Sequence, residues 1–440
     1  MLTVLLWSFV ERHAFTSLRA WKDDPARKPL VLRGARQVGK TWLLREFGRS
    51  DYEKVVYVNC QRDAAIASVF EGDLAADRIL RGLEIAARET IQPATTLLII
   101  DEIQDVPPAL TSLKYLQEER PDIHLATAGS LLGLALRADA SFPVGKVNFL
   151  DLHPLDFDEF LRGVGEAQLA DVVLQQDWGL IDPFRERLIE LLRLYMFVGG
   201  MPEAVLRHAE GASTDVVRAV QLDIIRGYEN DFAKYASAEE SRRIAQVWAS
   251  MPGQLARENR RFVFGHVRQG GRARHFEDAI QWLADAGLVH RVTRYTKPAS
   301  PVRTYEDRNI FKLFLHDVGL LGALSQLDAT VLLQGVGIFE EFKGALTEQY
   351  VLQQIVATRN EAPMYWAADQ AKAEVDFAIE RGGALVPIEV KAAENLRSKS
   401  LRSYINRFHP PQALRFSLSN YRAQADMTNV PLYAIGPSLK

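Results

Sequence analysis

Cysteine is almost absent from this 440-residue sequence, and histidine shows no metal-binding pattern. A single cysteine, Cys60, excludes an intramolecular disulfide framework and any zinc or iron–sulfur site that needs several cysteines. It is also typical of a reducing compartment. None of the nine histidines stands in a His-Glu-x-x-His motif or a similar spacing, so we do not expect a histidine-built metal site.

The sequence also lacks a strong charge of one sign and a long apolar run. Its net charge of −3 excludes a protein that is basic over its whole surface, so any nucleic-acid-binding surface must be local. Residues 1–10 are apolar, but they are too few to span a bilayer and lack a basic flank and a cleavage site. We expect them to pack on the first domain as a helix or strand. We expect a cytoplasmic protein without membrane contact.

The first third of the sequence alternates strand-like and helix-like segments. The strand-like segments are apolar without polar alternation, which is typical of a parallel sheet covered on both faces by helices. We predict strands near residues 29–33, 55–58, 97–100 and 123–128, and helices over residues 41–47, 75–90 and 110–118.

The remainder changes character twice. Helical patterns dominate residues 184–235, with a break at residues 199–202. Several short helices over residues 237–324 come with a strand at 287–294 and a second strand near 303–305, and helices followed by a β-hairpin are the order of a winged helix. A glycine-rich seam at 335–337 precedes a helix over 339–359 and three strands, which lie around Met364, around Val375 and over 386–390.

Residues 34–41 match the phosphate-loop pattern G-x-x-x-x-G-K-[ST] in full, between a predicted strand and a predicted helix. Glycines let such a loop curl so that its backbone N–H groups converge on phosphates at the positive end of the helix. Lys40 can reach the β- and γ-phosphates, and the Thr41 hydroxyl can bind Mg²⁺. The predicted nucleotide-binding residues are Gly34, Ala35, Arg36, Gln37, Val38, Gly39, Lys40, Thr41 and Trp42.

Asp101 and Glu102 follow the apolar run 97–100, at the sheet edge where ligands bind in open α/β folds. Asp101 would hold Mg²⁺, directly or through water, and Glu102 would polarise the attacking water. A pair of acids that only caps a helix is the alternative. Ser130, after the next strand, could sense the γ-phosphate, and an ordinary turn is the alternative there. Three arginines are available as a charge-stabilising finger, and none of them is assigned: Arg36, Arg120 and Arg137.

Several segments together resemble one prokaryotic family. They are the strand and phosphate loop at 31–41, Asp-Glu-Ile-Gln at 101–104, and residues 141–160, 195–203, 276–289, 373–377 and 387–391. These segments resemble the AAA-superfamily ATPases whose C-terminal half is a companion domain of unknown function. The resemblance covers nearly the whole chain and implies ATP binding. The phosphate loop and the acid pair predict Lys40 and Glu102 as the catalytic residues. It does not define a biological role.

The section 257–274 is rich in arginine although the sequence is acidic overall. A winged helix places one helix in the major groove and its hairpin along the backbone, and both need cations. We expect DNA or RNA binding here, and a basic surface that is solvated or docks on a protein is the alternative. The cations are Arg257, Arg260, Arg261, Arg268, Arg272 and Arg274, followed on the hairpin by Arg291, Arg294, Lys297 and Arg303.

The segments 374–377 and 387–391 resemble the core of restriction-endonuclease-like nucleases. On a strand, Glu389 and Lys391 share one face, and Asp376 could complete a carboxylate pair for a second Mg²⁺ or for Mn²⁺. The resemblance implies that Lys391 orients water or stabilises the charged phosphate and that Glu348 contributes from the preceding helix. Alternating edge strands, or the same fold without cleavage, are the alternatives.

The sequence thus predicts an α/β protein of four parts. They are a parallel-sheet P-loop ATPase domain (1–165), a helical lid (166–236), a winged-helix domain (237–335) and an α/β restriction-endonuclease-like domain (336–440). The expected function is hydrolysis of ATP with Mg²⁺, coupled to binding or processing of DNA or RNA. A nucleotide-dependent signalling switch that acts on a protein partner, with an inert end domain, is the alternative. Either function allows oligomerisation.

Overall fold

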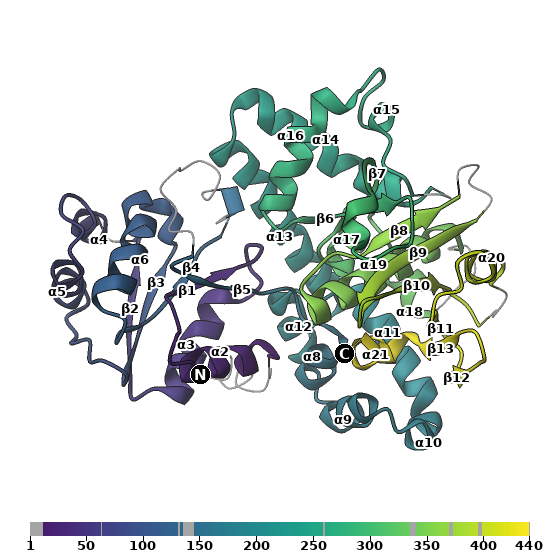
Figure 1. Ribbon diagram of the computed structural model, residues 1–440, viewed down its shortest axis with the longest axis horizontal. Coiled ribbons are helices and arrows are strands. Elements are labelled where there is room, and N and C mark those ends of the chain that lie inside the picture. Colours follow the sequence, from purple (N-terminus) through teal and green to yellow (C-terminus); the bar gives the residue numbers. More distant parts are fainter. Residues whose placement is uncertain are drawn as a thin grey trace. The chain divides into compact units, whose positions relative to one another are not determined.

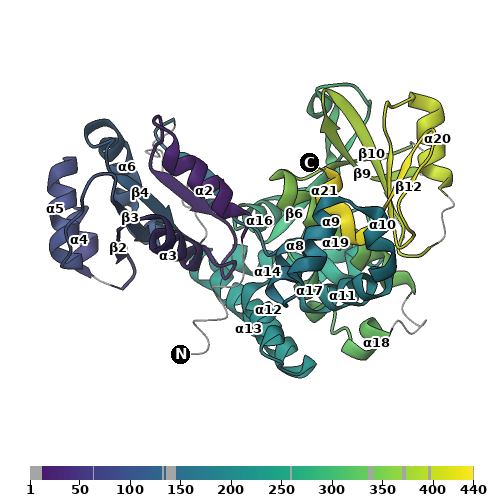
Figure 2. The ribbon, with the colours of Figure 1, turned by 90° about the horizontal axis from the view of Figure 1, so that it is seen from below.

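The computed structural model describes residues 12–62, 64–130, 133–134, 145–257, 260–334, 340–368, 373–394 and 398–439. The chain divides into two compact units (Figures 1 and 2). The N-terminal unit consists of Glu11–His153 and Asp285–Gly287, and the C-terminal unit contains Pro154–Ala284 and Leu288–Lys440. The predicted segment at residues 1–10 and the glycine-rich seam at 335–337 lie outside the described residues. The four predicted domain boundaries stay predictions.

The N-terminal unit contains a five-stranded, fully parallel sheet in the order β2-β3-β4-β1-β5. Leu98 and Ile100 of β3 pack into a core with α5 and α6, whereas Leu97 lies against Gly48 of α3. Successive side chains of a strand point to opposite faces, so helices cover both faces of the sheet. The strands are β1 (Leu30–Arg33), β2 (Lys54–Asn59), β3 (Thr96–Asp101), β4 (His124–Ala128) and β5 (Asn148–Asp151), and the helices are α2 (Ala14–Asp23), α3 (Lys40–Asp51), α4 (Ala64–Val69), α5 (Ala76–Ala87) and α6 (Pro107–Glu119).

The strands and helices predicted for the first third are therefore confirmed. Strand β5 has no counterpart among the predicted strands, because its four residues begin and end with polar side chains. The strand order has one consequence for the site. Because β4 lies between β1 and β3, the carboxyl ends of these three strands lie next to one another.

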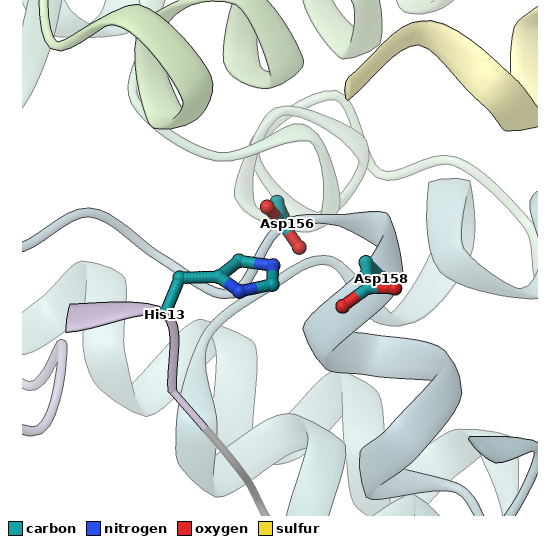
Figure 3. Close-up of side chains that lie close together, drawn as sticks. All are labelled: His13, Asp156 and Asp158. Carbon is teal, nitrogen blue, oxygen red and sulfur yellow. The ribbon is translucent and has the colours of Figure 1, made fainter. Parts of the chain in front are cut away.

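The C-terminal unit begins with helices, as predicted for residues 184–235. The first, α8 (Phe157–Gly163), starts with a capping box, in which the carboxylate of Asp156 accepts a hydrogen bond from the backbone of Glu159 at 2.8 Å. Figure 3 shows Asp156 and Asp158 at this helix start, where negative charge is favourable. The helices that follow are α9 (Ala167–Gln175), α10 (Trp178–Ile181), α11 (Arg185–Val198), α12 (Pro202–Ala209), α13 (Thr214–Tyr235), α14 (Ala238–Leu255), α15 (Phe264–Val267) and α16 (Ala273–Asp285).

A mixed eight-stranded sheet follows, in the order β12-β13-β11-β10-β9-β8-β6-β7. Helix α20 packs on β9 and β10 (Figure 2), and α19 packs on β7 and β10. The strands are β6 (Val289–Tyr295), β7 (Glu306–Leu315), β8 (Met364–Ala367), β9 (Glu374–Arg381), β10 (Ala384–Val390), β11 (Leu414–Ser417), β12 (Arg422–Ala423) and β13 (Thr428–Pro431), and the helices are α17 (Val318–Leu324), α18 (Ala329–Gln334), α19 (Glu340–Arg359), α20 (Lys399–Phe408) and α21 (Ile435–Leu439).

The hairpin and the last section form one continuous sheet. Strands β6 and β7 pair antiparallel, and β6 joins β8 in parallel at Arg294 and Tyr365. The strand expected near 303–305 is wrong in its position, because residues 302–305 form a 3-10 turn and β7 begins at Glu306. Pro301 fixes its own backbone and has no N–H to donate, which favours a turn at this point over a strand.

Helix α19 joins distant parts of the C-terminal unit through buried glutamines. Gln353 accepts a hydrogen bond from the backbone of Val318 at 2.9 Å and donates to the Tyr195 hydroxyl at 2.8 Å and to Asp317 at 3.1 Å. Gln349 is bonded to both backbone groups of Leu315. These bonds satisfy polar groups that water does not reach, so they hold α19 to α11, β7 and α17.

A tight turn completes this contact. The chain breaks between α11 and α12 at Gly199, whose φ of 75° lies in the left-handed region. A Cβ atom at Gly199 would lie 2.3 Å from the Asp317 carboxylate, which leaves space only for glycine. The predicted break at 199–202 is therefore confirmed. No described helix is both long enough and apolar enough to cross a membrane.

We predict that Gln353→Met lowers the free energy of unfolding by about 1–3 kcal/mol, because buried groups lose their partners. Urea titration of the full chain, followed by circular dichroism, measures this change. Gln168→Met, on the exposed side of α9, is the matched control and should change stability by less than about 0.5 kcal/mol. Equal effects of the two substitutions would contradict the role of Gln353.

Candidate nucleotide-binding site

The loop between β1 and α3 has the backbone that a phosphate loop requires. Gly34 has a φ of 145°, and a Cβ atom there would lie 2.2 Å from the carbonyl oxygen of Leu152. Gly39 caps α3 with a φ of 95°. Both positions therefore need glycine. Between them, Ala35 and Val38 are buried, while Arg36 and Gln37 are exposed.

Lys40 lies inside this loop. Its ammonium group donates to the carbonyl oxygens of Gly34 and Ala35, each at 2.8 Å, and the residue is 7% exposed. Burial lowers the pKa of Lys40 to about 8, although Glu102 and Asp101 oppose this shift. A cation that is removed from water and held inside a loop of this pattern is suited to bind phosphate oxygens.

Asp101 connects the start of α3 to the end of β3. One of its carboxylate oxygens accepts hydrogen bonds from the Thr41 hydroxyl at 2.9 Å and the Tyr57 hydroxyl at 2.7 Å. The other oxygen accepts from the backbone of Glu102 at 3.0 Å. Asp101 is 3% exposed, so these three donors replace the water that its charge would otherwise need. Thr41 and Asp101 supply hard oxygen atoms, the donor set that fits Mg²⁺.

Glu102 and Ser130 meet across the sheet edge. Ser130, after β4, donates through its hydroxyl to Glu102 at 3.2 Å, and Gln104 donates to the same oxygen at 2.6 Å. This contact follows from the position of β4 beside β3. Glu102 itself has a φ of 51°, uncommon for a residue other than glycine. The structure thus brings together Lys40, Thr41, Asp101, Glu102 and Ser130 at one edge.

Other predicted residues have less direct positions. Trp42 lies on α3, where its ring contacts Phe15 of α2 edge-on. Among the candidate fingers, Arg120 is paired with Asp77 and Asp122, and Arg137 lies outside the described residues.

Three further residues support the site without having been predicted. The buried Arg12 donates to the carbonyl oxygen of Val38 at 3.2 Å and so holds the loop from behind. Tyr57 and Gln104 bind the two acids directly. The only sequence signal for Gln104 is its place in the Asp-Glu-Ile-Gln segment, and Arg12 has no signal besides its charge after an apolar stretch.

The predicted nuclease-like residues divide into two groups. In the first, Glu348 is buried and pairs with Arg260 and with Lys312, and Lys312 also pairs with Glu374. Burial and the neighbouring Glu348 raise the pKa of Asp376 well above its usual value. Asp376 also accepts a hydrogen bond from the backbone of Val390 at 2.7 Å.

In the second group, the buried Glu389 pairs with Lys391 at 2.9 Å. Glu389 also lies in register with the buried Arg415 on β11. Among the described residues, Glu348, Asp376 and Glu389 do not form a group of three carboxylates whose oxygens lie within 4.8 Å of one another. The role of these residues as metal ligands stays a prediction.

Three family models match the chain. Residues 26–161 match an AAA domain, residues 189–331 match a domain of unknown function (DUF8612), and residues 343–435 match a second domain of unknown function (DUF4143). None of the curated proteins matches.

Solved structures show more distant similarity. A Walker-type ATPase of Pyrococcus abyssi is 14% identical with a TM-score of 0.46, over 72% of this chain and 95% of that one. The ORC1 protein of Aeropyrum pernix, solved in complex with DNA, is 15% identical with a TM-score of 0.32, over 72% and 94%. The RuvB Holliday junction branch migration motor of Thermotoga maritima is 16% identical with a TM-score of 0.29, over 64% and 90%.

The phosphate loop, the paired acids after β3 and the match over residues 26–161 agree with one another. The protein therefore contains an AAA-superfamily P-loop ATPase domain, followed by C-terminal domains of unknown function.

Proposed function

We propose that the chain binds ATP with Mg²⁺ at this edge of the sheet and hydrolyses it. The observation that carries the proposal is the assembly of Lys40, Thr41, Asp101, Glu102 and Ser130 at the ends of three adjacent strands. Thr41 and Asp101 would hold the ion, which would neutralise charge between the β- and γ-phosphates. The family match over residues 26–161 supports the same chemistry.

The chain's own side chains would bind the phosphates and orient the attacking water. Lys40 would exchange the carbonyl oxygens of Gly34 and Ala35 for phosphate oxygens, so it needs only a short movement. Glu102 would accept a hydrogen bond from the attacking water and orient it toward the γ-phosphate. Gln104 and Ser130 hold one oxygen of Glu102, which limits the directions in which this carboxylate can point.

We further propose that nucleotide state controls nucleic-acid binding by the C-terminal unit. Exposed arginines near the start of α16 support this coupling. The alternative is a switch that acts on a protein partner. The two functions differ in turnover, because a motor or processing enzyme spends ATP on its substrate whereas a switch retains its nucleotide.

Lys40→Ala should abolish ATP binding, because a charge-assisted contact worth about 1.5–3 kcal/mol is lost along with the only buried cation of the loop. Fluorescence titration with a labelled ATP analogue measures the affinity. Lys114→Ala, which removes an exposed lysine of α6, is the control and should bind normally. Unchanged affinity in a folded Lys40→Ala protein would contradict the site.

Glu102→Gln should keep ATP binding and slow hydrolysis by about 10²–10⁴-fold, since a neutral amide holds water in place but accepts no proton. A phosphate-release assay under saturating ATP and Mg²⁺ measures the rate. The exposed Glu118→Gln on α6 is the matched control. Hydrolysis at the wild-type rate would show that another residue orients the water.

The coupling predicts that DNA or RNA raises the steady-state ATPase rate by about tenfold or more at low salt, because nucleic-acid binding would favour the active arrangement. The rate is measured with and without a duplex and a single-stranded oligonucleotide. Very slow turnover that neither oligonucleotide changes, with nucleotide retained through gel filtration, would favour the protein-directed switch.

A further inference from the structure

The start of α16 carries a concentrated positive surface. Arg268, Arg272 and Arg274 are exposed there around His275. The ring nitrogens of His275 lie 3.3 Å from the backbone nitrogen of Arg272 and 3.3 Å from Nε of Arg274. Figure 1 shows α14, α15 and α16 together at one end of the C-terminal unit. We call Arg268, Arg272, Arg274 and His275 the α16 patch.

Arg260 of the basic section and Arg291 and Arg294 of the hairpin are paired with carboxylates, whereas Arg257 and Arg261 are exposed. Arg260 is largely covered, with a side chain 16% exposed, and its ion pair with the buried Glu348 removes it from the expected nucleic-acid surface. On the hairpin, Arg291 pairs with Glu277 and Arg294 pairs with Asp307. Hairpin arginines that already neutralise carboxylates have less charge to offer to phosphates. The winged-helix prediction, in which the hairpin follows the backbone, therefore loses part of its electrostatic basis.

The three arginines of the α16 patch have no such partners. None of them forms an ion pair with a carboxylate in the part of the chain that the structure describes. Partial desolvation lowers the pKa of His275, and so do four nearby arginines, at positions 274, 268, 243 and 272. Among the described residues, Arg243 of these four pairs with an acid, Glu239. Positive charge at a helix start is also unfavourable. An anionic ligand would relieve both costs.

The composition of the patch favours a polyanion over a protein. Gly270 and Gly271 lie between the arginines and add no side chain of their own. Phe276, the aromatic residue beside His275, is buried, so it does not offer the exposed aromatic anchor that protein interfaces favour. Glu277 and Asp278 follow along α16 and would repel phosphates, so the contact is with the start of the helix and not with its length.

We propose that the α16 patch contacts the phosphate backbone of a nucleic acid, end-on from the start of α16. The inference rests on the proposed nucleic-acid function and assigns it to residues other than the hairpin. Guanidinium groups form paired hydrogen bonds with phosphate oxygens, and protonated His275 adds a further charge when the ligand is bound. Binding therefore strengthens as the pH falls.

The first test compares two triple variants of the full chain by fluorescence anisotropy with a labelled duplex. The variant Arg268→Gln/Arg272→Gln/Arg274→Gln removes the patch. Lys297→Gln/Arg303→Gln/Arg308→Gln removes the same charge from exposed hairpin positions. At about 0.9 per neutralised phosphate, the slope of log affinity against log salt should fall by about 2.7 in the patch variant and stay unchanged in the hairpin variant.

The second test uses pH. His275 is neutral at higher pH in the free protein, because its pKa is lowered, and bound phosphates would raise that pKa. Affinity for the duplex should therefore rise between about pH 8 and about pH 5.5, by at most tenfold per unit. His275→Gln should remove this rise and keep most of the binding at high pH. If His275 had only a structural role, His275→Gln would not selectively remove the rise in affinity at low pH.

The outcomes separate this inference from the proposed function. A patch variant with the wild-type salt slope, or a hairpin variant that loses the same slope, overturns the inference and leaves nucleic-acid coupling intact. A wild-type chain that binds neither duplex nor single strand at low salt overturns both. Polyglutamate that binds the patch as tightly as an oligonucleotide of equal charge would show a surface for acidic proteins and would also overturn the inference.

Discussion

A buried carboxylate must be satisfied by hydrogen-bond donors, and each compact unit contains one that accepts hydrogen bonds from several segments. Asp101 is 3% exposed and Asp317 is fully buried. Asp101 accepts hydrogen bonds from Thr41, Tyr57 and the backbone of Glu102. Asp317 accepts from the backbone of Gly200 and Leu320 and from a glutamine of α19. Because an unsatisfied buried charge costs several kcal/mol, each aspartate fixes the segments that supply its donors.

This constraint prepares the nucleotide site before any ligand binds. The bond between Thr41 and Asp101 sets the start of α3 against the end of β3, so the two side chains expected to hold the ion are already adjacent. Lys40 is held by carbonyl oxygens in the same loop. These groups are therefore ordered when the protein folds, so nucleotide binding does not have to supply the cost of ordering them, although Lys40 must exchange its carbonyl partners for phosphate oxygens.

Local patterns predicted the phosphate loop and the parallel strands, because glycine spacing and unbroken apolar runs depend on neighbours in sequence. Contacts between distant segments could not be predicted in this way. Arg260 and Glu348 are 88 residues apart, and nothing near Arg260 distinguishes it from the exposed Arg268. The helix predicted over 339–359 is confirmed as α19, but its pattern did not show that its glutamines are buried, because their partners belong to other elements. The order of the strands, which brings Ser130 to Glu102, is likewise a property of the whole sheet.

The ion pairs of Arg260 and Lys312 also affect the protonation of the nuclease-like residues. Arg260 and Lys312 supply two positive charges to Glu348 and Glu374, and their attraction lowers the pKa of Glu348 although burial opposes this. The raised pKa of Asp376 favours its neutral form beside them. The two cations, two carboxylates and one neutral acid form a cluster without net charge. Binding of a divalent ion would therefore require Asp376 to lose its proton, and its affinity would fall steeply as the pH is lowered.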